Sequence, residues 1–156
     1  MIDALYSDKI LKAAANMPRA GRLAAPDGSA EKVAKLCGSR VRVDVKLMDG
    51  RIADYAQEVK ACALGQAAAA ILGEYVIGAT PDEVAEARDA LGAMLKSGGP
   101  PPGGRFADLA ILAPVRDYPP RHASTMLAFE ATVEACRQAL EASRAPQART
   151  SPAGAA

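Results

Sequence analysis

Two cysteines of this chain stand where a thiol could bind a metal ion or act as a nucleophile. Cys37 lies in the segment KLCGSR, in which Gly38 frees the backbone and the cations Lys35 and Arg40 favour the thiolate. Cys62 lies in VKACALG, where we expect a strand to end and a helix to begin, so it faces the positive end of a helix dipole. A free cysteine is also commonly a small buried hydrophobic residue. The local pattern therefore leaves both interpretations open.

The other residues that could bind a metal ion give a weaker pattern. His122, the only histidine, lies in PPRHASTML, in a predicted loop or helix start, where a lone histidine is usually solvated. Cys136 lies between Val133 and Leu140 in an amphipathic segment, and we assign it to the core.

No standard catalytic motif is present in the sequence. It contains no phosphate-binding glycine loop, no nucleophile elbow and no helix with paired histidines, and GGPPPGG lacks the following lysine and serine or threonine. A conventional hydrolase or kinase is not supported, and we expect that the protein is not an enzyme.

Charge and composition restrict the partners and the compartment. Lys and Arg number 19 against 18 for Asp and Glu, so no strong positive field favours nucleic acid. Asp3, Asp8 and Lys9 interrupt the first apolar residues, and no apolar run reaches the roughly 20 residues that span a bilayer. We expect no membrane contact. An odd number of cysteines argues for reduced thiols, and hence for the cytoplasm.

The strongest strand signal follows Cys37. In VRVDVKLMDGRI, apolar and polar residues alternate from Val41 to Leu47, before Asp49-Gly50 turns the chain. We predict a hairpin whose return strand covers residues 51–60, and a third strand from EKVAKL, which precedes Cys37.

Helical signals occupy most of the remaining sequence. TPDEVAEARDALGAMLKSGG combines Thr80 as N-cap, Pro81 at the first position and Glu83 three residues after the cap. Further helices are predicted over residues 2–15, after Cys62 and over residues 124–142, with a short apolar segment at 106–112. We predict one α+β domain, residues 1–142, in which a small antiparallel sheet of about three strands packs against several helices, followed by a flexible tail, residues 143–156.

The order of these features resembles the U-type iron-sulfur cluster assembly scaffolds, the IscU, SufU and NifU N-terminal group. LYSDKILKAAANMPRAG is similar to the family's opening tyrosine and NPRNxG motif. CGSRVRVDVKLMDGRIADYAQEVKACALGQAAAA resembles its CGD, strand, hairpin, strand and GCxxxxA run, and PPRHASTMLAFEA resembles PVKxHCxxLAxxA. The resemblance covers roughly residues 5–140 and implies the family's fold and scaffold role.

Carried over residue by residue, the resemblance places Cys37 and Cys62 on the first two cluster cysteines. The family's aspartate after the first Cys-Gly is Ser39 here. An ungapped alignment places Ser124 on the third cysteine and Ala123 on the preceding histidine, whereas a slip of one residue aligns His122 with the histidine and Ala123 with the cysteine. Neither register recovers a third thiol.

Three functions remain open on this basis. The first is a scaffold-like protein that binds iron or an iron-sulfur cluster through Cys37 and Cys62, with sulfur from a cysteine desulfurase; a homodimer would supply the four thiolates of a [2Fe-2S] cluster. The second is a non-catalytic family member that binds a desulfurase or another assembly factor. The third is a zinc site of the thiols with only a structural role. Cys37, Cys62 and His122, with water or Ser124 as the fourth ligand, could hold one zinc or iron ion, and Ser39 is a further oxygen donor.

Overall fold

A three-stranded antiparallel sheet, in the order β1-β2-β3, forms one layer of the fold in a computed structural model that describes residues 7–144. The strands are β1 (Gly28–Ala34), β2 (Ser39–Met48) and β3 (Arg51–Lys60). Asp49 and Gly50 join β2 to β3 with φ of 53° and 76°, the backbone that a tight hairpin turn requires. The predicted α+β class and hairpin are confirmed. The third strand begins at Gly28, earlier than the EKVAKL segment indicated.

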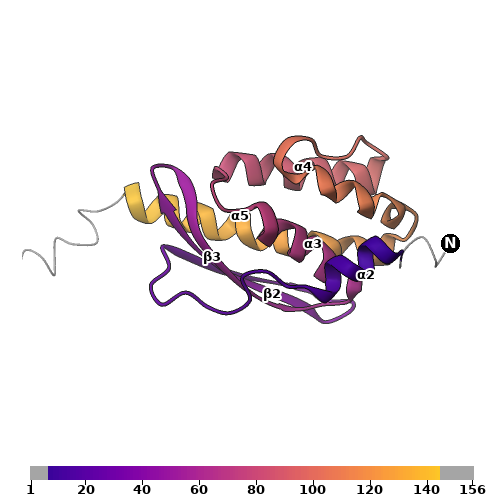
Figure 1. The fold of residues 1–156 in the computed structure, drawn as a ribbon, viewed down its shortest axis with the longest axis horizontal. Coiled ribbons are helices and arrows are strands. Elements are labelled where there is room, and N and C mark those ends of the chain that lie inside the picture. Colours follow the sequence, from indigo (N-terminus) through magenta and orange to yellow (C-terminus); the bar gives the residue numbers. More distant parts are fainter. Residues whose placement is uncertain (1–6, 145–156) are drawn as a thin grey trace, which may run out of the picture.

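The inner face of the sheet packs against α5 (His122–Arg144), which runs along β1 and β2 (Figure 1). Val41, Val43 and Val45 point to this face and are fully buried, as the alternating pattern predicts. Gly28 permits the close approach of α5, because a Cβ atom there would lie 2.0 Å from the Ala135 carbonyl oxygen.

Part of the outer face is covered by residues 19–27, which cross from the edge of β3 to the start of β1. Asp44 is therefore buried, although the alternation assigned it to the polar face. Its carboxylate accepts hydrogen bonds from Arg22 Nε at 2.7 Å, Ser29 Oγ at 2.6 Å and Leu23 N at 3.0 Å. Burial raises the pKa of Asp44, but these hydrogen bonds outweigh burial and hold that pKa below its ordinary value.

The helices form the second layer. The helix α2 (Asp8–Ala15) packs on α3 (Ala63–Tyr75), and α4 (Pro81–Ser97) packs on α5, on the side away from the sheet (Figure 1). The capping box of Thr80 and Glu83 is confirmed, since each side chain accepts the other residue's backbone N–H. The predicted apolar segment at 106–112 is part of a 3₁₀ run, η1 (Gly104–Asp117), and η2 (Pro119–Arg121) leads into α5.

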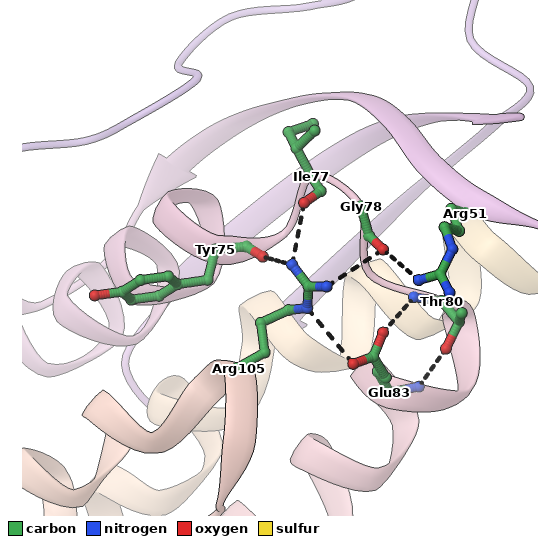
Figure 2. A network of polar contacts seen from close by, with 7 residues as sticks. All are labelled: Arg51, Tyr75, Ile77, Gly78, Thr80, Glu83 and Arg105. Atoms are coloured by element: carbon green, nitrogen blue, oxygen red, sulfur yellow. Dashed lines mark hydrogen bonds and ion pairs between the residues drawn. The ribbon is translucent and has the colours of Figure 1, made fainter.

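The C-terminal end of α3 is fixed by Arg105 of η1 (Figure 2). Its guanidinium donates to the carbonyl oxygens of Tyr75 at 3.0 Å, Ile77 at 3.1 Å and Gly78 at 3.4 Å. Its Nε lies 3.6 Å from Glu83 Oε2, at the start of α4. One side chain thus joins η1, the end of α3 and the start of α4.

The described residues begin and end inside two of the predicted segments. Residues 2–6 of the predicted first helix and residues 145–156 of the predicted tail lie outside the described residues, and residues 143 and 144 belong to α5. Among the helices of residues 7–144, none has the length and apolar character needed to span a bilayer.

Candidate functional site

Cys37 and Cys62 lie at the same end of the sheet. Cys37 is in the turn before β2 and Cys62 follows β3, and the pairing of Arg40 with Lys60 brings these two strand ends together. The start of α5 is the third segment at this end, because the charge of Arg121 acts on Cys37 and Ser124 contacts Cys62. We call these three segments, residues 35–40, 59–66 and 118–125, the cysteine end.

Cys37 is exposed on the four-residue turn between β1 and β2. The turn is closed by Gly38 N, which donates to the Ala34 carbonyl oxygen at 2.8 Å, and Gly38 has a φ of 74° that favours glycine. Cys37 Sγ lies 3.0 Å from Ser39 Oγ. Hydrogen bonding to Ser39, assisted by the charge of Arg121, holds the pKa of Cys37 below its ordinary value. The turn therefore presents a thiol that ionises readily.

Cys62 is the N-cap residue of α3 and is half-buried. Its Sγ lies 3.4 Å from Ser124 Oγ, and Ser124 is buried in the first turn of α5. The two helix starts approach closely because residue 65 is glycine: a Cβ atom there would lie 2.9 Å from the Ser124 carbonyl oxygen. The structure thus brings Ser124 to the Cys62 thiol.

His122 does not join the thiols. Its Nε2 lies 3.0 Å from the Val115 carbonyl oxygen and 3.2 Å from that of Arg116, so this nitrogen faces the 3₁₀ run η1. Across residues 7–144, no three His, Cys, Asp or Glu side chains are grouped to hold a metal ion. The predicted combination of Cys37, Cys62 and His122 is therefore not assembled in this structure, and the zinc site receives no support from it.

Cys136 lies in the core, as its position in the amphipathic pattern predicts. It is buried in α5, and burial raises the pKa of its thiol to about 12. A thiol with that pKa stays protonated near neutral pH, so Cys136 is unsuited to bind a metal ion or act as a nucleophile.

The donor set of the cysteine end is two thiols and two hydroxyls, those of Ser39 and Ser124. Thiolates suit iron and iron-sulfur clusters, whereas neutral hydroxyl oxygens are poor ligands for them. Two thiols are half the number of thiolate ligands that a [2Fe-2S] cluster takes. The three segments of this end contain four cations and no Asp or Glu; these cations are Lys35, Arg40, Lys60 and Arg121. One of them is paired from outside the segments, because Glu31 on β1 lies 3.7 Å from Arg40.

Comparisons with known proteins identify similar chains. Residues 5–125 match the family model described as the NifU-like N terminal domain. The crystal structure of a nitrogen-fixing NifU-like protein (N-terminal) from Brucella abortus is 54% identical in sequence, with a TM-score of 0.88 over 90% of this chain and 97% of the other. An iron-sulfur cluster assembly scaffold protein for the SUF system from Fervidobacterium islandicum AW-1 is 22% identical, with a TM-score of 0.78 over 86% and 98%. The latter similarity shows the fold alone, and no curated protein matches the chain.

Proposed function

The chain belongs to the family of NifU-like N-terminal domains, and from this premise we propose that Cys37 and Cys62 bind iron or an iron-sulfur cluster as cargo during assembly. The observation that carries the proposal is the position of both thiols at the same end of the sheet, each beside a serine hydroxyl. The exposed Cys37 is open to delivery of iron and sulfur, and Cys62 is fixed at the start of α3. The role is binding and transfer rather than catalysis.

Two copies of the chain would complete the ligand set of a [2Fe-2S] cluster. Each copy supplies Cys37 and Cys62, so four thiolates surround the two irons without a third cysteine. A cysteine desulfurase is the proposed source of sulfur. The three free thiols fit a reducing compartment such as the cytoplasm.

A second candidate function is that of a binding partner that no longer assembles clusters. It is favoured by the serine at position 124, beside Cys62, and by the orientation of the His122 ring toward η1. In this case the protein keeps the fold and binds a cysteine desulfurase or another assembly factor.

Anaerobic reconstitution with ferrous iron and sulfide tests the first function and needs no desulfurase. We expect a brown protein with the visible absorbance of an iron-sulfur cluster bound by thiolates. Cys37→Ser and Cys62→Ser should both lose this absorbance, since each removes one of the two thiolates. The core variant Cys136→Ala is the matched control and should retain it.

The outcome that contradicts cluster binding is a colourless wild-type protein without iron after desalting. If such a protein still binds a purified desulfurase, and if both cysteine variants bind it equally well, the second function is the correct one.

A further inference from the structure

A hollow on the outer face of the sheet brings together charged side chains of all three strands. Its volume is about 310 Å³. Apart from Val59, all the residues that line it are charged: Glu31 of β1, Arg40 and Arg42 of β2, and Glu58 and Lys60 of β3. Pockets for small molecules measure about 300–1,000 Å³, so this hollow has room for a compact ligand only. We call it the outer hollow.

Two cations of the outer hollow face each other across neighbouring strands. Arg40 lies directly opposite Lys60 in the pairing of β2 with β3, and side chains in this relation point to the same face of a sheet. Both side chains are exposed. Like charges directly opposite each other destabilise a sheet, and an anion between them would remove that repulsion.

Arg42 supplies an independent observation in the same hollow. Its Nε is buried and has no hydrogen-bond partner within residues 7–144. Glu31 and Glu58 lie opposite Arg42 on the two neighbouring strands. Glu31 is paired with Arg40 at 3.7 Å, however, and no carboxylate of the described residues lies within ion-pair distance of Arg42. Buried polar groups are normally hydrogen-bonded, so the guanidinium of Arg42 lacks an acceptor that a ligand could supply.

We propose that the outer hollow binds a small oxyanion with two or more negative charges, the class that includes inorganic phosphate and polycarboxylates such as citrate. The planar guanidinium of Arg42 donates to the oxygens of the anion, because its geometry matches phosphate and carboxylate groups. Arg40 and Lys60 then face the anion instead of each other. The hollow has three cations and two carboxylates, so a divalent anion gains twice as much from the excess positive charge as a monovalent one.

Amide chemical shifts in two-dimensional NMR of the full-length protein without a cluster test the site, so the result does not depend on the proposed function. The titrants are sodium phosphate, sodium citrate and sodium acetate, with sodium chloride added to keep the ionic strength constant. We expect saturable shifts at residues 40–42 and 58–60 with phosphate, citrate or both, and binding of acetate that is weaker by about tenfold or more. The anion that binds more tightly identifies the ligand as a phosphoryl compound or a polycarboxylate.

Two variants separate the outer hollow from the general surface charge. Arg42→Gln should weaken binding by about tenfold, the effect of losing one charge-assisted hydrogen bond. Its matched control is Lys96→Gln, which removes an exposed positive charge from α4 and should stay within about twofold of wild type.

Glu58→Gln should have the opposite effect and strengthen binding about threefold, because it removes a carboxylate that repels the anion. A gain in affinity cannot result from misfolding. Its matched control is Glu86→Gln, which removes an exposed negative charge from α4.

The inference is overturned if neither phosphate nor citrate gives saturable shifts at residues 40–42 and 58–60, or if sodium chloride at the same ionic strength gives the same shifts. Equal affinities of Arg42→Gln and Lys96→Gln would also overturn it, since the anion would then respond only to the net charge of the protein.

Discussion

Position 124 is the residue at which the cysteine end differs most from a three-thiol site. Ser124 is buried, and its hydroxyl lies 3.4 Å from Cys62 Sγ and 3.2 Å from the Arg121 carbonyl oxygen. Thr125 Oγ1 also donates to that carbonyl, at 2.7 Å, so the carbonyl keeps a partner when the Ser124 hydroxyl is lost. A cysteine is close in size to serine. The position can therefore accept a thiol without loss of a required hydrogen bond.

We predict that Ser124→Cys makes the protein a stronger iron-sulfur binder. A third thiolate beside Cys62 adds a soft ligand to the site. If it stabilises the bound cluster by about 1.4 kcal/mol, loss of the cluster to a chelator slows about tenfold. The measurement is the decay of cluster absorbance after addition of a chelator.

Ala123→Cys is the control, because residue 123 is exposed and corresponds to the cysteine in the alternative register. If Ala123→Cys slows the decay and Ser124→Cys does not, then the one-residue slip is the correct alignment and Ser124 does not occupy the ligand position.

Two features of individual residues were not predictable from the sequence. The hydrogen bond from Cys37 Sγ to Ser39 Oγ depends on the geometry of the turn, in which Gly38 between the two residues has a φ of 74°. The orientation of His122 depends on the carbonyls of Val115 and Arg116, which the sequence placed just beyond a short apolar segment. The presence of Cys37 and Cys62 at one end, in contrast, follows from the pairing of a hairpin that the sequence does predict.

At the scale of elements, the hairpin and α4 were predictable because their signals are local. Alternating valines and Asp49-Gly50 specify the hairpin, and Thr80 with Glu83 specifies the start of α4. The burial of Asp44 was not predictable, because its partner Arg22 lies 22 positions earlier in the chain. Contacts between residues so far apart in the sequence depend on how the segment of residues 19–27 packs against the sheet.

The connection between α3 and α4 gives a prediction at this scale. Arg105→Met keeps the apolar stem of the side chain but removes all its donors to the carbonyls of Tyr75, Ile77 and Gly78. We expect the free energy of unfolding to fall by about 1–3 kcal/mol, because the Tyr75 and Ile77 carbonyls lose their side-chain donor. The Gly78 carbonyl keeps a donor, since Arg51 Nη1 lies 2.8 Å from it. Urea unfolding followed by circular dichroism measures this change.

The control for Arg105 is Arg88→Met on α4. Within residues 7–144, Arg88 pairs only with the adjacent Asp89, in an exposed ion pair, so the expected change is within about 0.5 kcal/mol. Equal losses in the two variants would show that the network at the end of α3 does not contribute to stability.

At the scale of the whole molecule, the cysteine end has two opposite effects on self-association. Its cations repel a second copy, whereas its thiols favour a second copy that completes the ligand set of a cluster. Two copies that meet at this end bring Lys35, Arg40, Lys60 and Arg121 from each side. Among the described residues, only Arg40 of these four has a carboxylate within ion-pair distance, that of Glu31. A [2Fe-2S] cluster bound by four thiolates is anionic, so in the proposed dimer it would both bridge the copies and offset their repulsion. Association should therefore depend on the cluster.

We predict that the protein without a cluster is a monomer of 16.1 kDa and that reconstitution doubles its mass. Size-exclusion chromatography with light scattering under anaerobic conditions measures both states, and addition of a chelator should return the dimer to the monomer. Cys62→Ser should remain monomeric after the same treatment, because two copies then supply only one thiolate each. A wild-type protein that carries a [2Fe-2S] spectrum at the monomer mass would contradict the shared cluster, since one chain would then have completed the ligand set with groups other than a second pair of thiolates.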